Sequence, residues 1–126
     1  MTKTANTTNT VEETIDPIRL TDNDTGTVYT LDFSRDAVVF AEGRGFVLDD
    51  VFKYPRTMIP EFFFYAFRKN HPNVPRSKTD ELLEKMGGFY PEFTERMVSL
   101  YNQARFSNRF QSDEDAGKNS RMTVEF

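Results

Sequence analysis

Residues 57–70 read TMIPEFFFYAFRKN, and five aromatic side chains fall within the six positions 62–67. A run of that length would suit a buried strand, but Ala66 and the polar residues 68–70 favour a helix. Thr57 is a good N-cap, and Pro60 is tolerated in the first turn, where its missing N–H would be unpaired anyway. In a helix the apolar side chains cover about 260° of the surface, whereas an ordinary surface helix needs only about 100°. The stretch therefore predicts a core helix covered on several sides, and leaves open a surplus of apolar surface for a partner.

Composition limits the classes of function. The chain has 126 residues, which suits one domain that buries roughly two-thirds of its unfolded surface. A net charge of −4 gives no field that would draw it onto nucleic acid or an anionic membrane. It has no cysteine, which excludes disulfides and cysteine-based metal sites and fits a reducing compartment. Without an apolar run of about 18 residues or a signal-peptide core, we expect a soluble cytoplasmic protein that does not span a membrane.

Both ends of the sequence differ from its middle. Residues 1–14 are rich in Thr and Asn and predict a disordered lead-in. Residues 15–110 carry the apolar patterns expected of a single α+β domain. Residues 111–120 read as an acidic linker, and residues 121–126 alternate apolar and polar side chains like a short strand.

The first part of the predicted domain is a β-hairpin. Residues 15–20 and 27–33 read as strands, and the second alternates side chains with the period of two that marks a half-buried strand. The six residues between them are rich in turn formers and end in Gly26, which tolerates a positive φ. Ser34 then caps a helix of about two turns that ends at Gly43 or Gly45.

The later helices are predicted from residues that typically begin or end a helix. Residues 46–53 are ambiguous: Asp49 and Asp50 would cap one helical turn, and Pro55 would stop it. Ser77 and Asp80 resemble a capping box for a further helix, which Gly87 and Gly88 would stop.

A last helix begins at Pro91 and runs to about residue 110. Its inner face carries an i, i+3, i+4 stripe, whereas Phe106 and Phe110 fall on the opposite face. The members of the stripe are Phe93, Met97, Leu100, Tyr101 and Ala104. The fold class predicted from all these segments is α+β, with an N-terminal β-hairpin, a cluster of about four helices and a short C-terminal strand.

Catalytic, metal and cofactor sites are not predicted. His71 is the only histidine and stands beside a proline, so we expect a bare, solvent-facing side chain rather than a ligand or a base. Asp49 and Asp50 lack the spacing of a calcium loop and fit a helix cap better. The glycine pairs at 43/45 and 87/88 lack the context of a phosphate loop. The chain is therefore predicted not to be an enzyme.

One basic cluster supports an alternative function. Arg68, Lys69, Arg76 and Lys78 bracket the connector after the aromatic helix. A small regulatory or adaptor protein that binds nucleic acid would use such a patch, centred on Arg68 and Arg76. The acidic composition argues against this function, and cations at a helix C-terminus are ordinary partners of the helix dipole.

The candidate partner-binding residues are apolar. Phe106 and Phe110 have no obvious use inside the domain if the stripe around Met97 faces the core. Met122, Val124 and Phe126 lie on one face of the predicted terminal strand. That strand would add to a sheet edge, either in its own hairpin or in a partner.

Several segments together resemble the tail assembly chaperones of long-tailed phages that infect Gram-positive bacteria. The similar segments are residues 29–33 (YTLDF), 41–46 (AEGRGF), 55–69, 82–89 around the double glycine, and 118–126 (KNSRMTVEF). They cover most of the chain beyond about residue 28, and their motifs are apolar rather than catalytic.

The resemblance implies a non-enzymatic assembly factor. Such proteins are thought to coat the tape measure protein, keep it soluble and recruit tail-tube subunits, and to leave before the virion is complete. The expected location is the host cytoplasm and not the mature virion. A holdase for an apolar helical client needs exposed apolar surface and a solubilising charge. We therefore expect Phe106, Phe110, Met122, Val124 and Phe126 to contact the client or another copy of the chain.

Overall fold

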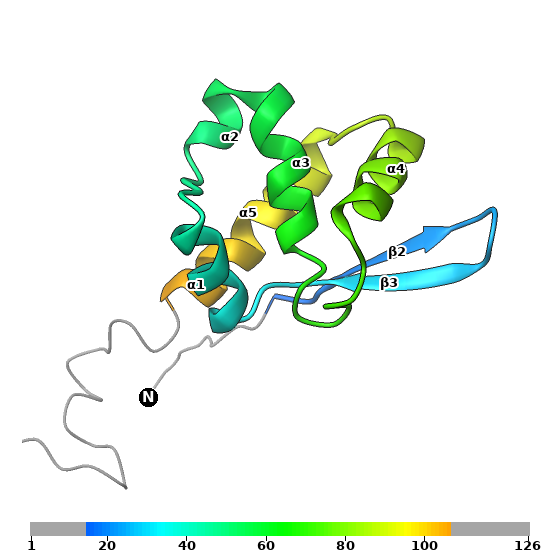
Figure 1. The fold of residues 1–126 in the computed structure, drawn as a ribbon, viewed down its shortest axis with the longest axis horizontal. Helices are drawn as coiled ribbons and strands as arrows, with labels where there is room; N and C mark the ends of the chain where they lie inside the picture. Colours follow the sequence, from blue (N-terminus) through cyan, green and yellow to red (C-terminus); the bar gives the residue numbers. More distant parts are fainter. Residues whose placement is uncertain (1–14, 107–126) are drawn as a thin grey trace, which may run out of the picture.

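An antiparallel hairpin opens the part of the chain that the structure describes. The computed structural model describes residues 15–106, in which β2 (Ile18–Asp22) pairs with β3 (Thr27–Leu31) (Figure 1). Ile18 lies opposite Leu31, and Asp22 lies opposite Thr27. The amides of residues 25 and 26 both donate to the Asp22 carbonyl and close the turn. The predicted hairpin is confirmed, although β2 begins three residues later and ends two residues later than predicted, and β3 ends two residues earlier.

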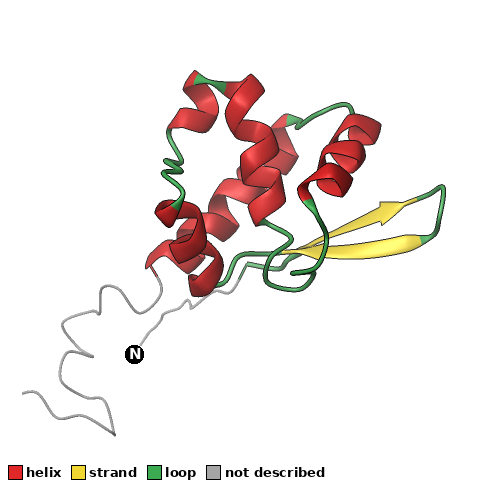
Figure 2. Ribbon diagram, in the orientation of Figure 1, coloured by secondary structure: helices red, strands yellow, loops and turns green. Residues whose placement is uncertain are grey.

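Helices make up the rest of the described chain and gather beside the hairpin, whose tip extends beyond them (Figures 1 and 2). They are α1 (Arg35–Gly43), α2 (Asp50–Lys53), α3 (Pro55–Tyr65), α4 (Arg76–Met86) and α5 (Pro91–Phe106). The predicted α+β class is therefore confirmed, and the ambiguous segment supplies α2 as a single turn.

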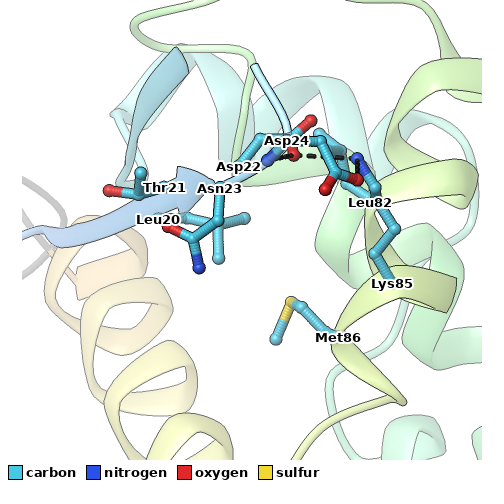
Figure 3. Close-up of a pocket in the computed structure, with 8 residues that line it drawn as sticks. All are labelled: Leu20, Thr21, Asp22, Asn23, Asp24, Leu82, Lys85 and Met86. Atoms are coloured by element: carbon cyan, nitrogen blue, oxygen red, sulfur yellow. Dashed lines mark hydrogen bonds and ion pairs between the residues drawn. The ribbon is translucent and has the colours of Figure 1, made fainter. Parts of the chain in front are cut away.

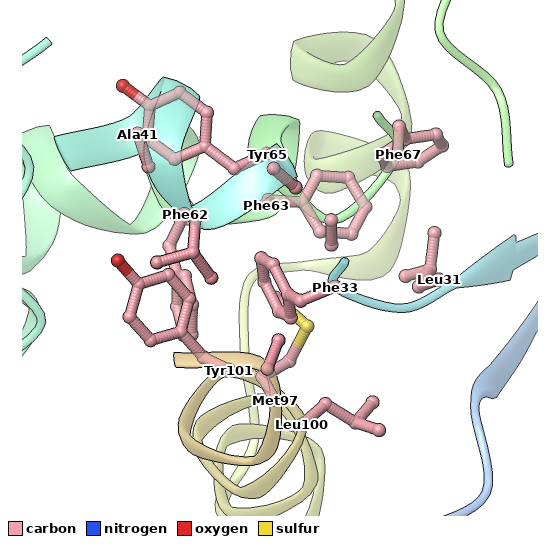
Figure 4. Close-up of a cluster of buried hydrophobic side chains, with 14 of the residues drawn as sticks. Leu31, Phe33, Ala41, Phe62, Phe63, Tyr65, Phe67, Met97, Leu100 and Tyr101 are labelled. Carbon is pink, nitrogen blue, oxygen red and sulfur yellow. The ribbon is translucent and has the colours of Figure 1, made fainter. Parts of the chain in front are cut away.

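The aromatic stretch forms the centre of the core. Phe62, Phe63, Tyr65 and Phe67 are each exposed by 1% or less. The ring of Phe62 lies 5.4 Å from that of Phe33, and the ring of Tyr101 from α5 also packs against it (Figure 4). Phe46, in the segment after α1, contributes a further ring at 5.5 Å. Aromatic pairs at such distances stabilise a core beyond the area that they bury. The prediction of a core helix is confirmed.

The inner face of α5 completes this core. All five residues of the predicted stripe, from Phe93 to Ala104, are buried. Pro91 is the first residue of the helix, as predicted, because a helix leaves that N–H unpaired. Ser34 also caps α1 as expected, since its hydroxyl accepts a hydrogen bond from the Ala37 amide at 3.1 Å.

Two predicted helix starts are wrong. The one-turn helix α2 does end before Tyr54 and Pro55, as predicted, but Pro55 also opens α3. The earlier start places Thr57 inside the helix and Pro60 beyond its first turn. α3 also ends at Tyr65, and residues 66–70 form turns. α4 begins after Pro75 without a side-chain cap, so Ser77 and Asp80 form no capping box. Asp80 instead pairs with Arg76 one turn earlier, because charged partners at i and i+4 face each other on a helix.

Several predictions concern residues outside the described range. The lead-in at residues 1–14, the linker at 111–120 and the terminal strand at 121–126 all lie there. The same holds for the last four residues of the predicted domain, which was expected to extend to residue 110.

Candidate functional site

A hollow lined by apolar and charged side chains lies between the segment that follows α1 and the end of α5. Its volume is about 380 Å³, and α1 and α5 pack against each other beside it (Figure 1). Two of its apolar side chains are well exposed, Val47 by 52% and Phe106 by 44%. The lining residues are Glu42, Phe46, Val47, Leu48, Tyr101, Arg105 and Phe106, which we call the α1–α5 groove.

The backbone after α1 decides which side chains face this groove. Gly45 has a φ of +86°, which turns the chain back so that the Phe46 amide donates to the Ala41 carbonyl. Phe46 is buried against Phe62 and Tyr101. Val47 follows the buried Phe46 and is largely exposed to solvent. Three successive apolar side chains of an irregular segment cannot all point into the core.

On the other wall of the groove, the helical geometry of α5 determines which of its side chains are buried and which are exposed. Tyr101 belongs to the buried stripe, whereas Phe106 comes five residues later and falls on a different face. The guanidinium of Arg105 lies 4.7 Å from the centre of the Phe106 ring. A cation over an aromatic face stabilises the pair and holds the ring at the rim of the groove.

Two charged side chains, Glu42 and Arg105, line the groove together with Tyr101. Tyr101 is 2% exposed, and burial together with the nearby charge of Glu42 raises its pKa to about 12. Arg105 acts in the opposite direction but more weakly. The phenol of Tyr101 therefore stays protonated at neutral pH and adds no charge to the groove.

A second hollow lies on the other side of Phe46. It has a volume of about 400 Å³ and is lined by Arg44, Gly45, Phe46, Met58, Glu61 and Tyr65. Its polar groups are already satisfied, because the Tyr65 hydroxyl donates to Glu61 and accepts from Arg44. Phe52 and Tyr54, in and just after α2, are more than 60% exposed. Neither of these two side chains lines either hollow.

Comparison with protein-family models assigns the chain to a family. A family model described as a domain of unknown function, DUF5055, matches residues 1–126. The chain belongs to this family. No curated protein matches it, and no solved structure does.

In this DUF5055 chain Phe106, one of the predicted partner-binding residues, lines the α1–α5 groove. Phe110, Met122, Val124 and Phe126 lie outside the described residues. The sequence analysis missed Val47 and Leu48, which the ambiguous segment concealed. The available signal was the run Phe46-Val47-Leu48 directly after a glycine, since a turn rarely buries three apolar neighbours.

The basic cluster of this DUF5055 protein is occupied by its own carboxylates. Each of the four cations makes at least one ion pair, with N–O distances between 2.7 and 3.4 Å. The pairs are Arg68–Asp36, Lys69–Asp32, Arg76–Glu61, Arg76–Asp80 and Lys78–Glu81. Such pairing reduces the positive potential that a phosphate backbone would meet.

His71 is not the solvent-facing side chain that was predicted. It is half-buried, and its Nε2 accepts a hydrogen bond of 2.9 Å from the Thr30 amide. Its ring also packs edge-on against Tyr29. The connector folds back onto β3, which the local sequence does not reveal, and His71 therefore acts as a structural acceptor.

Acidic and imidazole side chains do not converge on any one point of the described chain. Within residues 15–106, no group of three or more His, Asp or Glu side chains is arranged to hold a metal ion. None of the helices in that range is both long enough and apolar enough to cross a membrane. We take the α1–α5 groove as the candidate functional site because Val47 and Phe106 are exposed there.

Proposed function

We propose that this chain is a phage tail assembly chaperone that binds the tape measure protein through the α1–α5 groove and recruits tail-tube subunits. The observation that carries the proposal is the exposure of two apolar side chains, Val47 and Phe106, that line the same hollow between charged residues. Partner-binding surfaces of soluble proteins are typically marked by contiguous exposed apolar side chains with a polar border. The resemblance of the sequence to such chaperones supplies the identity of the client.

The proposed mode of binding is a helix in a groove. An amphipathic client helix would lay its apolar face against Val47, Leu48 and Phe106, with Glu42 and Arg105 at the border. Phe110 follows Phe106 by four residues and is proposed to contact the same client. The chain acts without catalysis, works in the host cytoplasm and is absent from the mature virion. A second copy of the chain is the other candidate occupant of the groove.

The alternative, a nucleic-acid-binding regulator that uses Arg68 and Arg76, has less support. Both guanidinium groups are held by carboxylates at 3.1 Å or less. A salt-dependent gel shift remains the measurement that would favour it, because phosphate binding weakens steeply as salt rises.

Co-expression with the tape measure protein tests the main proposal. In the double variant Val47→Ser/Phe106→Ser, we expect recovery of the tape measure protein in a pull-down to fall at least about tenfold. The reason is that each exposed apolar side chain buried by a client contributes on the order of 1.5 to 3 kcal/mol. Circular dichroism should show that the variant remains folded.

Phe52→Ser provides the matched control, because this ring is 63% exposed and does not line the groove. The control should retain wild-type recovery. A folded groove variant that recovers as much tape measure protein as the wild type would contradict the proposal. Sedimentation of the chaperone alone, with and without the substitutions, identifies a second copy as the occupant.

A further inference from the structure

The two edges of the hairpin differ. On β3, the Thr30 amide donates to His71 at 2.9 Å, and the Thr30 carbonyl accepts from the Asn70 side chain at 3.2 Å. Just beyond the strand, the Asp32 amide donates to the Ala66 carbonyl at 3.1 Å. Residues 66–71 thus form hydrogen bonds along most of this edge. Val28 is the residue of β3 whose outward-facing backbone groups they do not reach.

The edge of β2 is open. Arg19 lies opposite Thr30, whose backbone groups point away from β2, so those of Arg19 point away from β3. The same alternation turns the backbone of Thr21 outward. Neither residue has a backbone hydrogen-bond partner on that side within the described chain. An open edge of this kind is a template for another strand.

A hollow of about 430 Å³ borders this open edge. Its lining comes from β2, the turn after it and α4, and includes no residue of β3. Leu20 and Met86 face the space between β2 and α4 in Figure 3, and Leu82 adds to its apolar wall. A strand added beside β2 would place every second side chain over this hollow.

We propose that residues 121–126 of the chain add to β2 as an antiparallel third strand, with Thr123 opposite Thr21 and Glu125 opposite Arg19. In this register Met122, Val124 and Phe126 share the face of Leu20 and cover the hollow. Glu125 and Arg19 form a cross-strand ion pair on the exposed face, where Arg19 has no ion-pair partner in the described chain. The register therefore pairs the open backbone groups, covers the apolar wall formed by Leu20, Leu82 and Met86, and pairs the charge of Arg19, while Lys85 keeps its ion pairs with Asp22 and Asp24 in the same hollow.

The chain's own terminus is the favoured occupant because of its reach. Ile15 donates to the Gln103 side chain at 2.8 Å, so the start of the hairpin lies within one turn of the end of α5. In the antiparallel register residue 121 lies beside the turn after β2, roughly 25 Å along the hairpin from Ile15. Residues 107–120 join Phe106 to that point and can cover the distance, because they span roughly 20 Å on average and about 45 Å when extended. A tether of this length gives an effective concentration near the millimolar range, above that of a separate copy in solution. The inference does not depend on what binds the α1–α5 groove.

Disulfide trapping in the full chain tests this pairing. The chain has no cysteine, so the variant Arg19→Cys/Glu125→Cys contains a single possible bond. Directly opposed residues of a hydrogen-bonded pair have Cα atoms about 5.5 Å apart, within the range of a disulfide. In a glutathione redox buffer we expect an intramolecular bond that forms at least ten times faster than in Arg19→Cys/Asn119→Cys. Equal rates in the two variants, or a cross-linked dimer as the main product, would overturn the proposal.

Amide hydrogen exchange supplies a second test without cysteines. The Arg19 and Thr21 amides should exchange at least ten times more slowly than in an unstructured chain, independently of protein concentration. Arg19→Glu should speed the exchange of the Thr21 amide, and Glu125→Arg in the same chain should restore its protection. Unprotected amides in the wild type, or no restoration by the second charge reversal, would refute the register.

Discussion

Tyr101 illustrates how a single side chain serves both the core and the surface. Its ring packs against Phe33, Phe46 and Phe62, while the residue also lines the α1–α5 groove. The sequence identified Tyr101 as a core residue through its place in the α5 stripe. Its contribution to the groove was not predictable, because the opposite wall comes from residues 42–48, more than fifty positions earlier.

The raised pKa of Tyr101 leads to a prediction at alkaline pH. Folding raises this pKa from the ordinary 10.0 to about 12, so the folded state holds the proton more tightly than the unfolded state. The resulting stability is fully present below pH 10 and is lost as the pH rises from 10 to 12. Two pKa units correspond to a loss on the order of 2 to 3 kcal/mol in the free energy of unfolding.

Urea unfolding at pH 9 and pH 11.5 measures this loss. Tyr101→Phe should show a smaller decrease between the two values, since the variant has no phenol to ionise at that site. Tyr90→Phe, a matched change in a ring that is 56% exposed, should keep the wild-type decrease. An unchanged decrease in Tyr101→Phe would show that the burial of this phenol does not control alkaline unfolding.

At the scale of elements, helix ends were predicted well where glycine determines them and poorly where tertiary contacts do. Gly87 ends α4 with a φ of +80°, as the double glycine indicated. Thr57 had the chemistry of a cap, yet α3 begins two residues earlier at Pro55, because the turn of α2 delivers the chain there. The residue that caps a helix depends on how the preceding segment approaches the helix. That approach is set by tertiary contacts and cannot be read from the neighbouring sequence.

Two glycine substitutions should therefore change stability in opposite directions. Gly43 is the last residue of α1, and a Cβ added there meets no atom within 4 Å. Gly43→Ala should raise the free energy of unfolding by about 0.5 kcal/mol, because alanine loses less conformational freedom in a helix. Gly87→Ala should lower it by about 1 to 2 kcal/mol, since a left-handed backbone is strained for any residue with a Cβ.

Chemical denaturation of the two variants checks this pair. Each has the same added methyl group in open space, so the backbone angle is the difference between them. A stability for Gly87→Ala equal to that of Gly43→Ala would contradict the assignment of Gly87 as a left-handed helix end.

On the scale of the whole molecule, ion pairs join elements that are distant in the sequence. Asp22 of β2 accepts from Lys85 of α4 at 2.8 Å, and Glu61 of α3 accepts from Arg76 of α4 at 2.7 Å. The Lys85 hydrogen bond holds the pKa of Asp22 below 3.8, although burial opposes it. Burial raises the pKa of Glu61, but hydrogen bonds from Tyr65 and Arg76 outweigh it and bring the pKa below 4.5.

Acid should consequently destabilise the fold. The folded-state pKa values of both carboxyls are lowered, so their contribution to stability is present above about pH 4.5 and is lost as the pH falls further. In Asp22→Asn/Glu61→Gln, stability measured by urea unfolding should fall less between pH 5 and pH 2.5 than in the wild type. Asp36→Asn removes an exposed pair with Arg68 and should leave the wild-type dependence, because exposed pairs contribute little. A double variant with the wild-type dependence would contradict this account.

The fold class, the core helix and the buried face of α5 were predictable because each follows from a regular spacing of apolar residues. The α1–α5 groove was only half predictable. Phe106 departs from the α5 stripe, and the spacing reveals that departure. Val47 is exposed because Gly45 and Phe46 fix the chain after α1, and this arrangement depends on contacts with α3 and α5.

The closure of β3 by residues 66–71 has a consequence for synthesis on the ribosome. The bond between Thr30 and His71 spans 41 positions, the pair of Asp22 with Lys85 spans 63, and the bond of Ile15 to Gln103 spans 88. A two-stranded hairpin is only marginally stable in water by itself. β2 and β3 are therefore not stabilised by their long-range contacts until α5 has been synthesised. We therefore expect the hairpin to be unstable in nascent chains, and folding to be completed only after nearly all of α5 has left the exit tunnel.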